Sequence, residues 1–216
     1  MNSDANTTYL VRHAQTAYSA HHVVNGALHV DIPLDDAGRA ASRQYADADW
    51  LAGIASCRTS GFGRTLQTAQ LLLPGARVPM TPDHRLNEVD YGSFEGGPWL
   101  TYGAWLVEAG WDAVPPGGTE SWRGCVLRML DGLLDCLALP GPRLVVGHGL
   151  LGSVARWLAG PHPPVGATTA LPVFPEAPYL EPLVLGEEEL RRLVAEGRRQ
   201  FDRPADRSNA GRAVAR

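Results

Sequence analysis

The stretch Tyr9-Leu10-Val11-Arg12-His13-Ala14-Gln15-Thr16, close to the N-terminus, decides how the chain is interpreted. Three apolar, β-prone residues run directly into an arginine and a histidine. This pattern is typical of a buried strand that presents a cation and an imidazole at its carboxyl end. In an open α/β sheet, ligands bind at that edge. Such a pair also arises by chance, so its meaning depends on partners elsewhere in the chain.

Length and composition bound the class of protein. With 216 residues, 44% of them hydrophobic and 19% charged, the chain suits one globular domain with a sizeable core. The formal net charge of −4 argues against a general affinity for nucleic acid. We find no apolar run as long as a membrane span and no signal-peptide pattern at the N-terminus, so we expect a cytoplasmic protein that does not bind membranes. Cys57, Cys125 and Cys136 are expected to be buried free thiols.

Strand and helix patterns alternate along the chain. Apolar runs predict strands at 9–11, 54–57, around 78–80, and at 144–146. Helical patterns run from an N-cap at Asp35 to Gly53, and over 61–73, 122–137, 150–158 and 187–201. The segments 17–32 and 86–97 have no clean periodicity. This alternation favours an α/β fold of three layers, in which helices cover both faces of a mostly parallel central sheet.

We expect one domain over residues 1–203, with three less regular segments. Residues 98–122 carry Trp99, Trp105, Trp111 and Trp122 and predict a small lid or insertion, with these side chains partly in the core and partly in a pocket wall. Seven prolines make 161–182 an extended segment, and 204–216 is expected to be a disordered tail.

Two arginines, two histidines and one glutamate are predicted to meet at one edge of the sheet. Arg12 ends the first strand, and His13 and His148 each follow a strand. Arg64 begins the helix after the second strand, and Glu88 lies in the irregular segment after the third strand. Arginine offers a fork of donors that matches phosphate oxygens, histidine can attack phosphorus, and a carboxylic acid can protonate a departing alkoxide. Each residue alone has an ordinary structural or surface explanation, so only the set indicates a site.

The motif Arg12-His13-Ala14-Gln15-Thr16 resembles the R-H-G-x-T signature of the histidine phosphatase superfamily, the phosphoglycerate-mutase-like proteins. Further segments are similar to motifs of that family, in the same order: DIPLDDAG at 31–38 to D-x-P-L-T-x-x-G, SGFGRTLQTA at 60–69 to S-x-x-x-R-x-x-Q-T-A, LNEVDYGSFEG at 86–96 to L-x-E-x-x-x-G-x-x-E-G, PGGTES at 116–121 to P-G-G-E-S, and VGHG at 146–149 to S/G-H-G. The resemblance spans residues 9 to 160 and implies the phosphoglycerate-mutase-like fold.

The resemblance also implies roles for individual residues. His13 would attack phosphorus and carry the phosphoryl group, and Glu88 would protonate the leaving oxygen and then help to activate water. The remaining residues would bind phosphate oxygens: Arg12, Arg64 and His148, with Gly149, Thr16 and Ser19 as further donors. The arginines supply the positive charge, so no metal or cofactor is expected.

Three positions depart from the family pattern. Ala14 stands where glycine is usual, Ser19 where an asparagine commonly touches the phosphate, and Asp35 where threonine is usual. We expect Ala14 to tighten the pocket, Ser19 to weaken one phosphate contact, and Asp35 to be a harmless N-cap exchange.

The histidines of the segment 17–32 need a separate explanation. His21, His22 and His29 could form a metal site with Asp31. A solvated or substrate-lining loop is the interpretation that we favour over a metal site.

Within the family, the sequence favours a phosphatase acting on a small-molecule phosphate ester. Mutases carry E-R-H-Y-G-x-L-x-G around the acid and a longer insertion after it, whereas here about twenty residues separate the Glu88 segment from the PGG motif. This looks like the small phosphatases, including those acting on α-ribazole phosphate, and the aromatic segment suggests a substrate with a flat or apolar body. A mutase and a phosphate-binding protein without turnover remain alternatives, and the irregular C-terminal third could form a homodimer surface.

Overall fold

A single five-stranded sheet forms the centre of the molecule. The computed structural model describes residues 5–75, 77–161 and 172–202. The strands β1 (Thr8–Arg12), β2 (Ser56–Thr59), β3 (Met80–Pro82), β4 (Arg143–Gly147) and β5 (Leu183–Leu185) lie in the order β3-β2-β4-β1-β5. Only β5, which pairs with β1, runs antiparallel to its neighbour. The mostly parallel sheet predicted from the sequence is confirmed.

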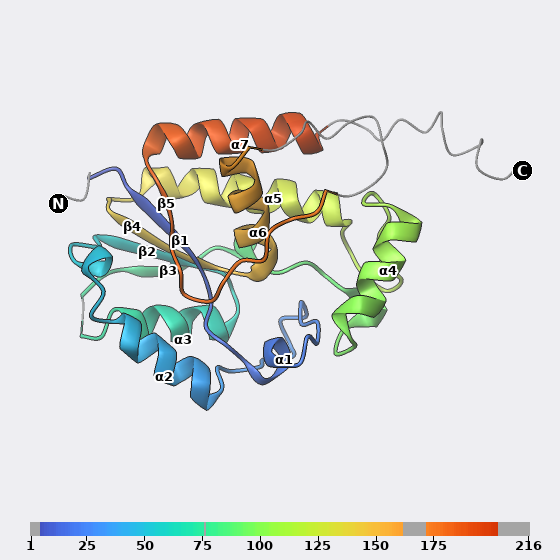
Figure 1. The fold of residues 1–216 in the computed structure, drawn as a ribbon, viewed down its shortest axis with the longest axis horizontal. Coiled ribbons are helices and arrows are strands. Elements are labelled where there is room, and N and C mark those ends of the chain that lie inside the picture. Colours follow the sequence, from blue (N-terminus) through green and yellow to red (C-terminus); the bar gives the residue numbers. More distant parts are fainter. Residues whose placement is uncertain (1–4, 76, 162–171, 203–216) are drawn as a thin grey trace, which may run out of the picture.

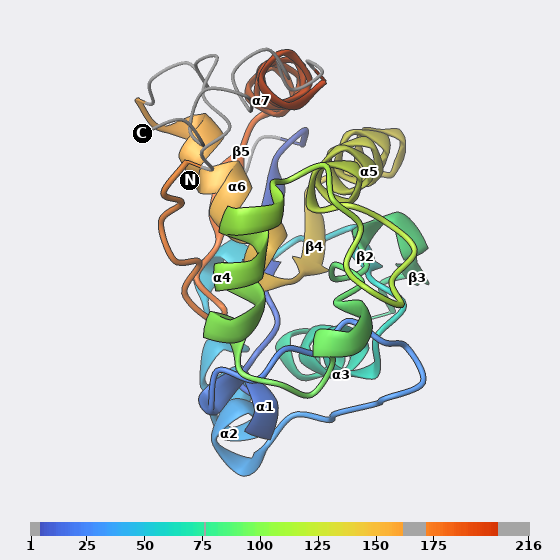
Figure 2. The ribbon, with the colours of Figure 1, turned by 90° about the vertical axis from the view of Figure 1, so that its right-hand side faces the viewer.

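Helices cover both faces of this sheet. The helices α2 (Asp36–Tyr45) and α3 (Gly63–Leu72) lie on one face, and α5 (Trp122–Asp135), α6 (Gly149–Ala159) and α7 (Glu187–Phe201) lie on the other (Figures 1 and 2). The short α1 (Ala17–Ala20) lies below the carboxyl end of β1, and α4 (Trp99–Ala109) stands at one end of the molecule (Figure 1). This is the three-layer α/β/α architecture that the sequence predicts.

The two central strands are buried on both sides, as expected for parallel strands between two helical layers. Because side chains alternate along a strand, Leu10 and Val145 pack into the core beneath α5, α6 and α7. Tyr9, Val11 and Val146 pack into the second core beneath α2 and α3. Both cores fix the strand ends from which His13 and His148 emerge.

The start of α2 explains one of the sequence motifs. Asp35 is the N-cap, as predicted, and its side chain accepts a hydrogen bond from the Gly38 N–H at 2.7 Å. A Cβ at position 38 would lie 2.2 Å from the carbonyl oxygen of Gln15. Glycine at position 38 therefore lets α2 pack against the chain that leaves His13.

The predicted helix from residue 36 to Gly53 is wrong in its second half. The helix α2 ends at Tyr45, and Trp50 belongs to a separate 3₁₀ helix, η1 (Asp49–Leu51). Two acidic residues, Asp47 and Asp49, follow the end of α2, where the helix dipole disfavours negative charge. The segment 17–32 is also not wholly a loop, because its first turn is α1.

Strand boundaries account for further corrections. The second strand is Ser56–Thr59 and not 54–57, and its partner β3 is Met80–Pro82, two residues later than expected. The predicted strand stopped before the charged Arg58, whose guanidinium forms an ion pair with Asp83 at 3.1 Å and so can lie within the strand. Neither α4 nor the three-residue β5 was expected.

The remaining elements follow the sequence patterns closely. The helices α5, α6 and α7 and the strand β4 are confirmed within two residues at each end, with the 3₁₀ helix η4 (Cys136–Ala138) extending α5. Two more 3₁₀ turns lie at the start of and within the irregular segment 86–97: η2 (His84–Leu86) and η3 (Gly92–Phe94). Cys57, Cys125 and Cys136 are buried and free, as expected.

Parts of two predictions fall outside the described residues, namely 162–171 of the proline-rich segment and the tail 204–216. Residues 172–182 of the proline-rich segment form no helix or named strand. Among the helices that the structure describes, none is long and apolar enough to cross a membrane.

Candidate active site

His13 follows β1 directly and is held in one tautomer. Its Nδ1 lies 2.7 Å from the carbonyl oxygen of Ala14, which can only accept, so Nδ1 carries the proton. The other ring nitrogen, Nε2, accepts a hydrogen bond from Arg64 Nε at 3.2 Å. The nitrogen with the lone pair therefore faces the guanidinium of Arg64.

Burial keeps His13 neutral. Loss of solvent lowers the pKa of His13 well below its usual value, and the positive charges of Arg64 and Arg12 lower it further. The hydrogen bond to Ala14 opposes this shift only partly. A neutral imidazole with its lone pair on Nε2 is the form that a nucleophile requires.

His148 lies beside His13 at the end of β4, where it is the N-cap residue of α6. The ring centroids of the two histidines are 5.3 Å apart and the rings meet edge to face. The Nε2 atom of His148 pairs with Ser60 Oγ at 2.8 Å, and Nδ1 pairs with Arg64 Nη2 at 3.3 Å. Burial, followed by the charge of Arg64, lowers the pKa of His148 well below its usual value.

Arg64 connects both histidines to a buried asparagine. It lies in the first turn of α3, is 3% exposed, and donates from Nη1 to Asn25 Oδ1 at 2.6 Å and from Nη2 to the Asn25 carbonyl oxygen at 2.9 Å. Asn25 in turn donates from Nδ2 to Glu95 Oε1 at 2.7 Å. Asn25 was not predicted from the sequence; Glu95, the second glutamate of the 86–96 motif, is the signal that could have led to it.

Arg12, the last residue of β1, is bound by residues far along the chain. Its Nη1 donates to the Ala177 carbonyl oxygen at 2.9 Å, and its guanidinium carbon lies 4.0 Å from the ring centroid of Tyr179. Its Nε atom is buried and has no hydrogen-bond partner among the described residues. A buried donor without a partner costs free energy, so Arg12 Nε is available to a ligand that enters the candidate active site.

Glu88 connects this cluster to a pocket. Its Oε1 accepts a hydrogen bond from the Val89 N–H at 3.0 Å. Burial raises the pKa of the Glu88 carboxyl, although the Val89 N–H and the charges of Arg64, Arg12 and Arg128 oppose the shift. A carboxyl with a raised pKa can act as a general acid.

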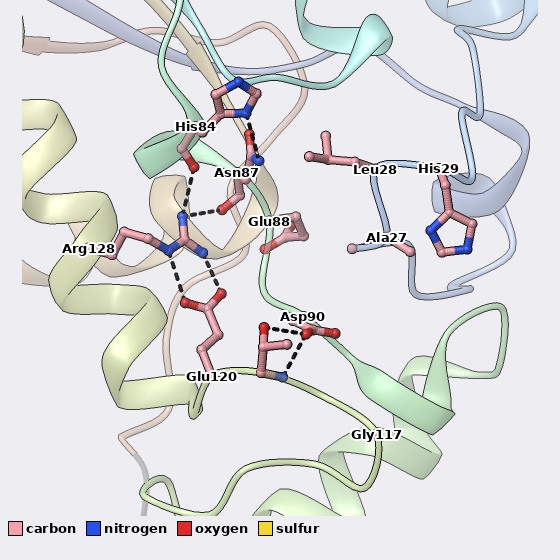
Figure 3. A pocket seen from close by; sticks show the side chains of 12 residues that line it. Ala27, Leu28, His29, His84, Asn87, Glu88, Asp90, Gly117, Glu120 and Arg128 are labelled. Atoms are coloured by element: carbon pink, nitrogen blue, oxygen red, sulfur yellow. Dashed lines mark hydrogen bonds and ion pairs between the residues drawn. The ribbon is translucent and has the colours of Figure 1, made fainter.

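The pocket has a volume of about 460 Å³, with Glu88 near its centre (Figure 3). Most of the side chains that line it are polar or charged. The full set of lining residues is Gly26, Ala27, Leu28, His29, His84, Asn87, Glu88, Asp90, Gly117, Thr119, Glu120 and Arg128. The buried His13, Arg64 and His148 are not part of this lining, whereas Glu88 lines the pocket and also interacts electrostatically with Arg64 and Arg12.

The tryptophans predicted as partly core and partly pocket wall divide differently. Trp111 and Trp122 are buried in the core, and Trp99 on α4 is 54% exposed. The pocket takes Gly117, Thr119 and Glu120 from this segment and none of its tryptophans. The polar lining therefore does not support our expectation of a flat or apolar substrate body.

The predicted auxiliary residues have the following places. Thr16 and Ser19 form a capping box at the start of α1, in which Ser19 Oγ lies 2.9 Å from the Thr16 nitrogen. The methyl of Ala14 is fully buried in the core under α2 and α3. Gly149 begins α6, and the Arg12 guanidinium lies 3.5 Å from the position that its Cβ would take. Of the loop histidines, His29 lines the pocket.

With the geometry established, comparison with known proteins identifies the family. The model of the histidine phosphatase superfamily (branch 1) matches residues 8–166. The chain therefore belongs to this superfamily of phosphatases and mutases, which confirms the resemblance found in its motifs.

Among the relatives and solved structures, some are named as mutases and others as phosphatases. A protein of Proteus mirabilis named "Probable phosphoglycerate mutase GpmB" is 34% identical over 162 residues, covering 70% of this chain and 74% of the relative. The α-ribazole phosphatase of Shigella flexneri shares the fold, with a TM-score of 0.58, 22% identity, and coverage of 71% of this chain and 80% of that one. TTHB049 from Thermus thermophilus has a TM-score of 0.53 and 26% identity over 70% of this chain and 84% of its own.

Proposed function

We propose that the protein is a phosphatase that hydrolyses a small organic phosphate monoester through a phosphohistidine on His13. The observation that carries the proposal is the state of His13. The Ala14 carbonyl holds the proton on Nδ1, and Nε2 faces a buried arginine. A neutral imidazole fixed in this way needs no further proton transfer before it attacks phosphorus.

In the first half-reaction the lone pair of His13 Nε2 attacks phosphorus. The N–P bond forms while the P–O bond to the organic group breaks, and its electron pair leaves with that oxygen. Glu88 in its acid form gives the oxygen a proton, a role that its raised pKa favours. Substrate entry replaces the contact between Arg64 Nε and His13 by contacts from Arg64 and Arg12 to phosphoryl oxygens, which stabilise the transferring group.

In the second half-reaction a water molecule attacks the phosphohistidine. The Glu88 carboxylate takes a proton from that water, the N–P bond breaks, and the imidazole returns to its neutral form with release of inorganic phosphate. Glu88 borders the 460 Å³ pocket, through which water can reach the intermediate after the organic product has left.

A mutase is the second candidate, because relatives at 34% identity carry that name. A phosphoglycerate mutase must also bind the carboxylate of its substrate. Arg128 lines the pocket, but its Nε and Nη2 bind Glu120 and its Nη1 binds the carbonyl oxygens of His84 and Asn87 (Figure 3). Its Nη1 also binds the carbonyl oxygen of Arg85. Arg128 and Glu120 neutralise each other, and Asp90 adds a negative charge to the lining, which disfavours a second anionic group and supports the phosphatase.

The test is release of inorganic phosphate from p-nitrophenyl phosphate and from a panel of metabolite monoesters, by the wild type and His13→Ala. We expect His13→Ala to abolish release, and the exposed His22→Ala to serve as a matched control with wild-type activity. Rapid quenching of the wild type should trap a phosphoenzyme that is labile in acid and stable in alkali. Wild-type activity in His13→Ala would refute the nucleophile, and transfer of label within phosphoglycerate without phosphate release would favour the mutase.

A further inference from the structure

We propose that the segment 176–180, which lies beyond the residues matched by the family model, holds Arg12 in position to bind phosphate, and that Tyr179 is its main positioning residue. The inference rests on the proposed function of Arg12 as a phosphate ligand. The family model ends at residue 166, so none of the family motifs accounts for this segment.

Besides an ion pair with the exposed Glu176 at 3.5 Å, three contacts from the segment orient the guanidinium of Arg12. Nη1 donates to the Ala177 carbonyl oxygen at 2.9 Å, Nη2 donates to the Tyr179 hydroxyl at 3.3 Å, and the guanidinium carbon lies 4.0 Å from the centroid of the Tyr179 ring. The two hydrogen bonds fix the in-plane rotation of the guanidinium, and the aromatic ring covers one of its faces.

These contacts leave donors of Arg12 for a ligand. Its Nε is buried without a partner among the described residues, and it lies 3.5 Å from the position that a Cβ of Gly149 would take. This donor therefore faces the start of α6, next to His148. The segment binds the outer nitrogens of the guanidinium and leaves Nε beside the phosphate-binding cluster.

The segment is itself held in place by two neighbours. The Leu180 N–H donates to the Arg12 carbonyl oxygen at 3.1 Å, so the segment is hydrogen-bonded to the end of β1. The Ala177 N–H donates to Ser153 Oγ on α6 at 3.2 Å. Leu180 has a φ of 64°, a conformation that a residue other than glycine keeps only when its surroundings hold it. Arg12 is thus held by a fixed segment.

A glycine of α6 permits this approach. A Cβ at position 152 would lie 2.7 Å from the Cβ of Ala177, closer than such atoms come in proteins. Gly152→Ala should push the segment away from α6 without changing Arg12, Tyr179 or the histidines. This substitution tests the placement of the segment independently of the tyrosine.

The experiment is a double-mutant cycle read by calorimetric binding of inorganic phosphate, which needs no turnover. We expect Tyr179→Leu to weaken phosphate binding roughly tenfold, and Tyr179→Phe, which retains the ring, to recover most of that loss. In an Arg12→Met background Tyr179→Leu should cause no further loss, because the tyrosine acts through the arginine. Gly152→Ala should weaken binding in the same direction, and the matched control Tyr45→Leu on α2 should leave it unchanged.

Specific outcomes would overturn the proposal. They are wild-type phosphate affinity in a folded Tyr179→Leu variant, or an equal loss from Tyr179→Leu with and without Arg12. If the wild type binds phosphate but hydrolyses no ester, the proposed function fails while the cycle still decides whether Tyr179 positions Arg12.

Discussion

The two arginines of the site are supported by different parts of the molecule. Arg64 is buried in α3 and bound by Asn25, which is bound in turn by Glu95, and all three lie within the residues that the family model matches. Arg12 is half-buried and bound by Ala177 and Tyr179, which lie outside that range.

The difference lies in where each arginine finds its support along the chain. Asn25 and Glu95 hold Arg64 against both histidines, and all of these residues lie within the range 8–166 that the family model matches. The other half of the site, around Arg12, depends on a segment that follows the last motif and returns along β1.

Replacement of each arginine should give the largest losses of activity and show most clearly how the two halves of the site differ. We expect Arg64→Met to lower kcat/KM by about 10³-fold and Arg12→Met by about 10²-fold, because charge-assisted hydrogen bonds are worth roughly 1.5–3 kcal/mol each and Arg64 also contacts both histidines. Steady-state phosphate release measures both, with the exposed Arg43→Met as a control. A larger loss for Arg12→Met than for Arg64→Met would reverse the comparison.

The pH dependence offers a second contrast. Burial raises the pKa of Glu88, so for an alkyl phosphate kcat/KM should fall about tenfold per pH unit once the pH exceeds this pKa and the acid form is lost. Because burial lowers the pKa of His13, no loss is expected as the pH falls through the ordinary histidine range.

Removing a cation near Glu88 should shift the alkaline limb of the pH profile, which is the fall in kcat/KM above the pKa of Glu88. Arg64 has a stronger charge interaction with Glu88 than Arg12 has, and both stabilise the carboxylate. Arg64→Met should therefore raise the pKa of Glu88 and shift the limb to higher pH, and Arg12→Met should shift it less. p-Nitrophenyl phosphate, whose leaving group needs no proton, should show no limb; an unmoved limb in Arg64→Met would contradict the expectation.

Asn25 provides an intermediate effect. Asn25→Ala removes the acceptor of Arg64 Nη1 and should lower kcat/KM about tenfold through misplacement of that arginine. In an Arg64→Met background the same substitution should have little further effect. Full additivity of the two losses would mean that Asn25 acts on the substrate directly.

Much of the fold, and the meeting of His13, Arg64 and His148 in one cluster, could be predicted because their signals are local. The strands that end in His13 and His148 are short apolar runs, and the motif at 60–69 places Arg64 at a helix start. Such patterns depend on neighbouring residues. The helix α7 was predicted over its full length for the same reason, since its amphipathic period lies within the helix itself.

The supporting contacts could not be predicted because they join residues far apart in the sequence. Tyr179 is 167 positions from Arg12, and Asn25 lies in a segment without periodicity, 39 positions from Arg64. Arg128, on a helix otherwise recognised by its apolar face, would be assigned to solvent, whereas its guanidinium binds Glu120 in the pocket wall. The path of the chain decides these contacts, and a polar residue in a loop carries no sign of it.

Glu95 supports Arg64 through Asn25, and Glu176 forms an ion pair with Arg12. Replacing either carboxylate should lower kcat/KM less than the changes above, and the two losses should differ from each other. Glu95 is partly buried and accepts hydrogen bonds from Asn25 Nδ2 at 2.7 Å and from the Gly26 N–H at 2.8 Å. Its replacement by glutamine brings an NH₂ group toward one of these donors and should lower kcat/KM about fivefold. Glu176 faces Arg12 Nη1 at 3.5 Å, but its side chain is 83% exposed. Glu176→Gln should therefore change kcat/KM by less than about twofold, since an exposed ion pair is screened by solvent, and added salt should remove even this change. Equal losses from both substitutions would mean that Glu176, outside the family-model match, supports Arg12 as strongly as Glu95, inside it, supports Arg64.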